Sequence, residues 1–197
     1  MAFYPAAVNE LFQKPRNAGV IERTAARGQA SSFTCGAALR ITLRIETPGY
    51  RIADARFQAT GCGYLLAAAS LLTEMVQGLR LSEAETVAAA PELCDALIIK
   101  HCGNVPPDRR HCIALCREAL QDALRNYRQS ALTAWQGAET FICVCFSVSE
   151  KTIQETITHG ALHTIAEVAA SCNAGAGCGS CRSLIQDLLD EHWRGLA

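Results

Sequence analysis

Four cysteines in the last third of the chain have the types and spacing of metal ligands. Cys143 and Cys145 are separated by one residue, and Cys178 and Cys181 by two, within the glycine-rich segment 174–181. Thiolates in two tight pairs form a soft, four-coordinate donor set that suits zinc or an iron–sulfur cluster. Zinc sites more often use two-residue spacings in both pairs. The pattern therefore favours a cluster, with a structural zinc site as the alternative.

A second set of candidate ligands lies in the first half of the chain. Cys35 precedes a glycine, and Cys62 stands between two glycines. Flanking glycines leave a thiol approachable, and a helix N-terminus favours its thiolate form, which binds metal. Cysteine is also a common buried core residue, so Cys62 alone leaves both interpretations open.

A third ligand in this set is expected from a His-Cys pair, and the chain has two such pairs. His101-Cys102 is followed by a turn-like Gly-Asn, whereas His111-Cys112 follows the stiff proline pair at 106–107 and precedes an amphipathic helix. The second pair is favoured because it would place Cys112 at a helix N-terminus.

Elements that could position these residues follow from the hydrophobic pattern. Residues 39–45 and 50–57 read as two strands joined by a turn at 47–49. Helices are expected over 65–76, from a capping box at 82–85, and after the proline pair as far as about residue 128. The pattern predicts an antiparallel hairpin with one face buried, followed by helices.

The segment from Gln129 to Thr140 has weak periodicity and contains Gly137, which indicates a boundary. We expect a first domain at 1–130, a linker at 131–139 and a second domain at 140–197. The second domain is expected to be small and all-α, with helices over 149–157, 162–170 and 183–193. Because so small a domain has little core, metal ligation would contribute to its folding.

Composition restricts the function classes. The chain has 197 residues, a net charge of -1 and eleven cysteines. Without a basic field, binding to nucleic acid or an acidic membrane is not indicated. The first residues do not resemble a signal peptide and no apolar run spans a bilayer, so a cytoplasmic protein with reduced thiols is expected. No nucleophilic triad or phosphate loop is recognisable, so an enzyme is not expected.

The first part of the chain resembles the U-type iron–sulfur scaffold family, IscU and NifU. The matching segments are 17–19, Cys35-Gly36, 54–63, 72–78, Pro106-Pro107 ahead of His111-Cys112, and 118–128. The resemblance implies an α+β fold, with a small antiparallel sheet packed by helices. It also implies that this scaffold domain assembles a transient [2Fe-2S] cluster, or holds iron or zinc, on Cys35, Cys62 and Cys112. It makes His111 a nearby or alternative ligand.

One departure from that family bears on cluster release. The family usually has an aspartate two residues after its first cysteine, where this chain has Ala37. A carboxylate there could ligate iron or help the cluster leave. Its loss implies a cluster that is more stable than usual or one that does not form.

The last part resembles the bacterioferritin-associated ferredoxin-like [2Fe-2S] domain. The similarity extends from 141 to 189 and includes residues 143–153, 164–168 and 174–181. It implies a permanent [2Fe-2S] cluster held by Cys143, Cys145, Cys178 and Cys181. Cys94, Cys102, Cys116 and Cys172, like His159, His163 and His192, belong to neither pattern and are expected in the core or at the surface, although Cys116 shares a helix face with Cys112.

The order of the two resemblances is that of NifU, without a counterpart of the third, C-terminal domain that full-length members usually carry. The resemblance implies a scaffold that builds a cluster and transfers it to apo-proteins, whether nitrogenase in nitrogen fixation or housekeeping clients. A cysteine desulfurase, an electron donor and a second copy of the chain are the implied partners. A redox or regulatory protein with two stable clusters is the second hypothesis, favoured by Ala37, and a structural zinc protein is the third.

Overall fold

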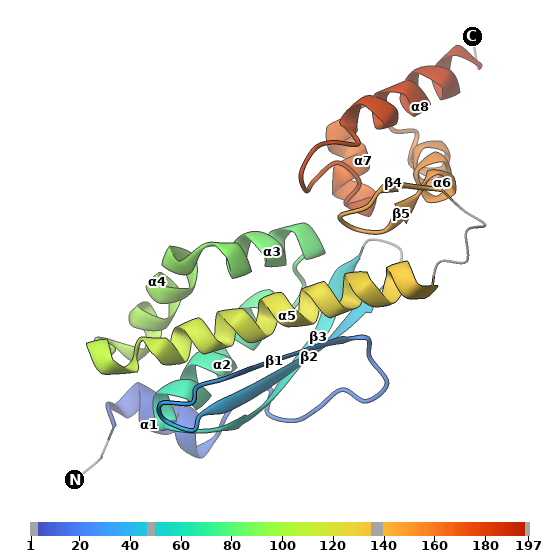
Figure 1. Cartoon of the computed structure of the whole chain (residues 1–197). Helices are drawn as coiled ribbons and strands as arrows, with labels where there is room; N and C mark the ends of the chain where they lie inside the picture. Colours follow the sequence, from blue (N-terminus) through green and yellow to red (C-terminus); the bar gives the residue numbers. More distant parts are fainter. Residues whose placement is uncertain (1–3, 47–49, 135–139, 196–197) are drawn as a thin grey trace. The chain divides into compact units, whose positions relative to one another are not determined.

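The computed structural model describes residues 4–46, 50–134 and 140–195. These residues form two compact units, the first mainly before residue 128 and the second mainly from residue 128 onward (Figure 1). The first unit combines a sheet with helices and the second is largely helical, which confirms the α+β fold class predicted from the sequence.

The sheet of the first unit contains β1 (Ala26–Ser31), β2 (Ala38–Glu46) and β3 (Arg51–Thr60), in that order. β1 is antiparallel to β2, with Gln29 opposite Arg40. The predicted strand at 39–45 lies within β2, and the one at 50–57 coincides with β3 from residue 51 onward; the predicted turn at 47–49 lies outside the described residues. β1 escapes sequence analysis because it has no β-branched or aromatic residue, so its strand conformation depends on pairing with β2.

Helices cover the sheet and supply most of the core. They are α1 (Ala6–Gln13), α2 (Gly63–Val76), α3 (Leu81–Ala89), α4 (Pro91–Cys102) and α5 (His111–Ala134), with a short 3₁₀ turn, η1, at Pro107–Arg109. α2 is apolar and buried through most of its length, and it packs against α1 and α4. The long helix α5 runs alongside the sheet (Figure 1).

β1 approaches α5 closely at Gly28. A Cβ atom at this glycine would overlap the carbonyl oxygen of Ala119 and the backbone nitrogen of Ala123. Asp122 and Asn126 of α5 also hydrogen-bond the β1 backbone, at the amide of Gln29 and the carbonyl of Arg27. This contact holds the middle of α5 against β1.

α5 is longer than the sequence indicates. The predicted end lies near Arg128, but the helix continues to Ala134 because no glycine or proline interrupts residues 129–134. The first residues of the predicted linker at 131–139 are therefore helical, and residues 135–139 lie outside the described part of the chain.

The second unit contains a small sheet and three helices. They are β4 (Phe141–Cys143), β5 (Val148–Ser149), α6 (Glu150–Gly160), α7 (Ile165–Cys172) and α8 (Arg182–Arg194). The antiparallel β4–β5 pair is an addition to the expected all-helical domain, and its two strands flank the turn that carries Cys145. Local capping starts two helices, since Ser149 caps α6 and Thr164 forms a capping box with Glu167 on α7. The helices enclose a core of buried apolar side chains: Phe146, Ile153, Ile157, Ile185 and Leu189.

Candidate metal centres

Three segments of the first unit carry the candidate ligands of its site. Cys35 lies in the loop between β1 and β2, just before the first predicted strand and beside Gly36, whose φ is +68°. Cys62 is the N-cap residue of α2, and His111-Cys112 opens α5 after the 3₁₀ turn η1. A loop and two helix N-termini thus present the donors.

The structure brings these four side chains together in pairs. Cys35 Sγ lies 3.4 Å from His111 Nε2, and Cys62 Sγ lies 3.6 Å from Cys112 Sγ. Cys112 Sγ is also 3.7 Å from His111 Nε2, which links the two pairs. Cys35 is exposed, whereas Cys112 is only 1% exposed. The site therefore has an exposed edge and a buried side.

The environment favours one thiolate at the buried pair. A hydrogen bond from the Cys112 thiol, with the backbone amides of Leu65 and Tyr64 at the start of α2, lowers the pKa of Cys62 to about 5. The same hydrogen bond and burial raise the pKa of Cys112. Cys62 is thus the thiol of this pair that is deprotonated and able to bind a metal ion.

At the exposed edge, the Ser32 hydroxyl, the Ala37 amide and His111 lower the pKa of Cys35. A hollow of about 410 Å³ opens here, lined by Ser32, Thr34, Cys35, Asp108, Arg109 and His111. Asp108 forms an exposed ion pair with Arg109 at 3.3 Å. The hollow gives dissolved ions access to Cys35 and His111.

The alternative His-Cys pair, His101-Cys102, lies at the end of α4. His101 is exposed, with its Nδ1 2.9 Å from the carbonyl oxygen of Leu97. Cys102 is buried and 3% exposed. The structure therefore groups Cys35 and Cys62 with His111-Cys112, whereas the His101 ring contacts a carbonyl of its own helix, α4.

The donor arrangement suits a binuclear cluster better than a single ion. Among the described residues, no three histidine, cysteine or carboxylate side chains already converge in a way that could hold one metal ion. A [2Fe-2S] cluster takes two protein ligands on each iron, so donors arranged in two pairs fit it. Ala37 is 3% exposed, and its methyl would lie 3.3 Å from a Cβ at Gly61, so position 37 packs against the neighbouring loop.

The second unit also presents its four thiols in pairs. Cys145 Sγ lies 3.4 Å from Cys178 Sγ, and the thiols of Cys143 and Cys181 interact with each other. Cys143 and Cys181 are 2% and 7% exposed, while Cys178 is exposed. Cys143 ends β4 and Cys145 lies in the turn that follows, while Cys178 and Cys181 lie in the segment between α7 and α8. This donor set fits a tetrathiolate cluster.

The exposed thiol of this set has the lower pKa. The hydroxyl and the backbone amide of Ser180 lower the pKa of Cys178 to about 7, and Cys178 Sγ lies 3.3 Å from Ser180 Oγ. Burial raises the pKa of Cys143. Ser32 and Ser180 were missed by sequence analysis, although a serine two or three residues from a ligand is a usable signal.

Glycine is required where the two turns meet. A Cβ at Gly177 would lie 3.0 Å from Cys145 Cβ and 3.1 Å from Cys145 Sγ. Gly175 and Gly179 adopt φ angles of +84° and +81°, which side chains rarely accept. The glycine-rich spacing of the sequence thus lets the second turn fold back onto Cys145.

The remaining cysteines are buried and do not belong to these pairs. Cys116 lies one turn after Cys112, is 1% exposed, and burial raises its pKa. Cys94 and Cys102 are also buried, as is Cys172, whose thiol donates to the carbonyl of Val168 at 3.3 Å. Neutral buried thiols of this kind are typical of core residues.

Two family models match the chain along most of its length. Residues 3–134 match the NifU-like N terminal domain. The chain belongs to this family. Residues 141–191 match the BFD-like [2Fe-2S] binding domain, which agrees with the cofactor predicted for the four C-terminal cysteines. Both resemblances identified in the sequence are thus confirmed.

Relatives and solved structures agree with this membership. The "Nitrogen fixation protein NifU" of Nostoc sp. is 36% identical over 95% of the chain, and the chain spans 63% of that protein's length. The "Iron-sulfur cluster assembly scaffold protein IscU" of Aquifex aeolicus is 35% identical over 63% of the chain and 75% of its own length. A scaffold-protein structure from Fervidobacterium islandicum, described as putative and as belonging to the SUF system, has a TM-score of 0.52 at 19% identity. It covers 60% of this chain and 93% of its own, and it shows the fold alone.

Across residues 4–46, 50–134 and 140–195, no helix combines the length and apolar character that crossing a membrane requires.

Proposed function

We propose that this chain is a non-catalytic scaffold for iron–sulfur cluster assembly, with one site that builds and releases a cluster and another that keeps its own. The observation that carries the proposal is the contrast between the sites. Cys35 and His111 line an open hollow of about 410 Å³, whereas two of the four thiols of the second site, Cys143 and Cys181, are buried in one small unit. The chain's family membership supports the same conclusion.

In the first unit, iron and sulfur are the cargo. Cys35, Cys62 and Cys112 are the proposed thiolate ligands, and His111 is the neighbouring or alternative ligand. Cys62 is already in its thiolate form near neutral pH, so it can bind ferrous iron without releasing a proton. Cys35 at the open edge is the thiol that an incoming sulfur donor, a cysteine desulfurase, can reach.

Assembly needs electrons as well as atoms. Two sulfane sulfurs take up four electrons to become sulfide, and two ferrous ions supply two of these as they become ferric. The other two must come from a reductant. A permanent [2Fe-2S] cluster on Cys143, Cys145, Cys178 and Cys181 carries one electron at a time and would supply them in two steps, after reduction by an external donor.

The proposed setting follows from the chemistry of the ligands. All eleven cysteines are free thiols, a state that a reducing compartment such as the cytoplasm maintains. The proposed partners are a cysteine desulfurase, an electron donor, apo-proteins that receive the cluster, and a second copy of the chain. Nitrogenase and housekeeping proteins are both candidate clients.

A transfer experiment tests the proposal. The whole chain is loaded anaerobically with ferrous iron, cysteine and a cysteine desulfurase, then mixed with an apo-ferredoxin, and iron, acid-labile sulfide and Mössbauer spectra are measured. We expect the cluster of the first unit to leave and that of the second to remain. Cys112→Ser should abolish transfer, whereas Cys94→Ser, a buried thiol outside the site, should not.

The same experiment tests the alternatives. If both clusters form and neither leaves, the chain is a redox or regulatory protein. The buried Ala37, which offers no carboxylate to the site, is the observation that favours this second function. A colourless protein that contains zinc would instead identify a structural zinc protein and overturn both.

A further inference from the structure

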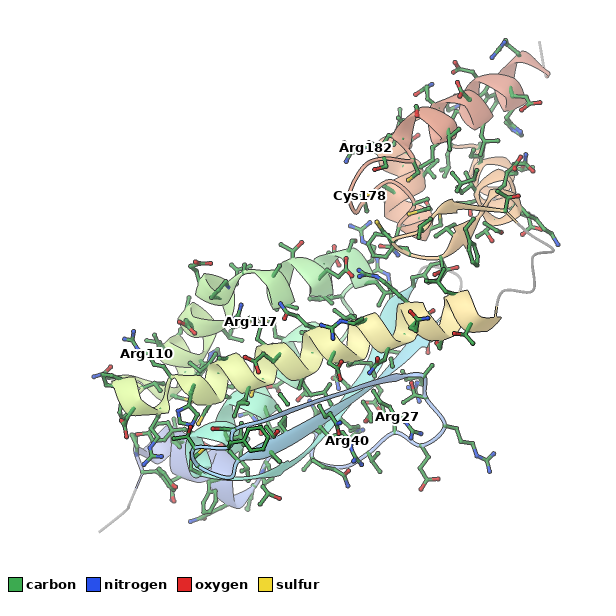
Figure 2. All side chains as sticks on the ribbon, viewed as in Figure 1. Arg27, Arg40, Arg110, Arg117, Cys178 and Arg182 are labelled. Carbon is green, nitrogen blue, oxygen red and sulfur yellow. The ribbon has the colours of Figure 1, made fainter. Side chains whose placement is uncertain are left out.

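Arg182 lies directly after the ligand Cys181 and is the first residue of α8. Its side chain turns back over the preceding loop, and its Nε donates to the carbonyl oxygen of Gly175 at 3.0 Å. Figure 2 labels Arg182 and Cys178 at this end of α8. The acceptor is seven residues back in the chain, so the hydrogen bond spans the loop that carries Cys178.

The same side chain covers both glycines that shape the loop. A Cβ at Gly175 would lie 3.5 Å from Arg182 Cγ, and one at Gly179 would lie 3.6 Å from Nε and 3.9 Å from Cζ. The Arg182 backbone amide also donates to the carbonyl of Gly179 at 3.1 Å. Arg182 therefore contacts the loop on both sides of Cys178.

The guanidinium brings a fixed positive charge to this loop. Arginine stays protonated at all relevant pH values. Within the described part of the chain, no carboxylate forms a salt bridge with Arg182, and the residue is exposed. Because an added electron increases the negative charge of a tetrathiolate cluster, a nearby positive charge favours the reduced state.

We propose that Arg182 is a positioning residue that fixes the Gly175–Gly179 loop and raises the reduction potential of the [2Fe-2S] cluster held by the four C-terminal cysteines. This inference rests on the proposed function, since it assigns a role toward that cluster. Nothing in the spacing of the cysteines requires an arginine here, and the assignment comes from the hydrogen bond and the contacts.

The test uses the full chain with its clusters and separates charge from position. Arg182→Gln removes the charge, and Arg182→Lys keeps it but loses the guanidinium. Arg194 is the matched control, because its Nε also donates to a backbone carbonyl, that of Asp190 at 3.0 Å, at the other end of α8. Potentiometric titration with dithionite, followed by electron paramagnetic resonance, gives the potential, and iron and sulfide analysis gives occupancy.

For Arg182→Gln, we expect a lower potential, with the reduced-to-oxidised ratio at a fixed applied potential falling about threefold, roughly 30 mV for a one-electron couple. The shift should shrink at high salt, because exposed charges are screened. In Arg182→Lys, the reduction potential should stay close to that of the wild type. In both Arg182 variants, the cluster occupancy of the second unit should fall. Arg194→Gln should change neither quantity.

Each result decides a part of the inference. An unchanged potential in Arg182→Gln overturns the role of the charge. Full occupancy and unaltered thermal melting in both Arg182 variants overturn the positioning role. If the wild-type chain itself has no [2Fe-2S] absorption from its second unit, the proposed function of that unit fails and the inference fails with it, an outcome visible before any variant is made.

Discussion

The two candidate metal centres use the same chemistry but are built in different ways. In the first unit, the donors come from a loop and two helices that are far apart in the sequence, at positions 35, 62 and 111–112. In the second, all four thiols come from positions 143–145 and 178–181 of one small helical unit. The first site therefore depends on packing between distant segments of a whole domain, whereas the second is formed by two short segments of one small unit.

This difference has a consequence for stability. The first unit has a core that includes the buried helix α2, so we expect it to keep its fold when its site is empty. The second unit is small, and its two turns join where Cys143 and Cys181 are buried. Metal ligation would supply folding free energy there. Release of cargo suits the first arrangement, and retention suits the second.

The largest effect is expected from Cys143→Ser. Removing this buried thiol, a proposed ligand, should abolish cluster binding in the second unit and, with it, the cooperative melting of that unit, while the first unit stays folded. Calorimetry with iron analysis measures both. Cys172→Ala is the control, because it removes a buried thiol of the same unit that is not a proposed ligand. If the second unit of Cys143→Ser still melted cooperatively, it would not need its cluster to fold, and the proposed difference between the two units would be wrong.

A substitution at Gly28 should have the next largest effect. In Gly28→Ala, the new methyl would strike the backbone of Ala119 and Ala123, so β1 and α5 must separate. We expect the first unit to lose about 3 kcal/mol of unfolding free energy and its iron binding, with the second cluster unaffected. Arg27→Ala, at the neighbouring exposed position, is the control. Urea unfolding would contradict the prediction by showing equal midpoints for the two variants.

Gly177→Ala probes the equivalent contact in the second unit. Its methyl would meet Cys145 at 3.0 to 3.1 Å, so the two cysteine turns must move apart by a few tenths of an ångström. We expect a loss of about 1 to 2 kcal/mol of unfolding free energy and reduced cluster occupancy, measured by visible absorption and iron content per protein chain. Gly195→Ala, where the new contacts are ordinary, should be neutral. Equal occupancy in both variants would show that the turns tolerate the change.

Ala37→Asp tests whether a carboxylate makes the first site more labile. Position 37 is buried beside Gly61, so the change should destabilise the first unit by about 1 to 3 kcal/mol. It should also raise the rate of cluster transfer to an apo-ferredoxin several-fold, because a hard oxygen donor suits a thiolate cluster less well. Stopped-flow spectroscopy follows the transfer. A slower transfer at equal cluster content would oppose the prediction.

The smallest effect is a difference in thiol reactivity between the metal-free sites. The pKa of Cys62 is lowered to about 5 and that of Cys178 to about 7, so at pH 6 the first is mainly thiolate and the second mainly thiol. Relative to its exposed area, Cys62 should therefore react with iodoacetamide faster than Cys178 at pH 6. Raising the pH from 6 to 8 should increase the reaction rate of Cys178 more than that of Cys62. Peptide mass spectrometry measures both, with buried Cys94 as the unreactive control.

Much of both sites is predictable from local sequence. The spacing of Cys143, Cys145, Cys178 and Cys181 identifies a tetrathiolate set, because its turns are short and rich in glycine. The strands β2 and β3 follow from alternation of apolar and polar residues. β1 and the last turn of α5 do not, because a non-local strand pairing and the absence of a helix stop decide them.

The sequence by itself determined the donor types, their paired spacing and the family. Only the tertiary structure decided that Cys35 meets His111 while Cys62 meets Cys112, since those pairs join segments 76 and 50 residues apart. It also decided which thiols are buried and that Arg182 spans its loop. Ligand identity is carried by residue type and short spacing, whereas exposure, pKa and long-range pairing arise from packing between distant segments.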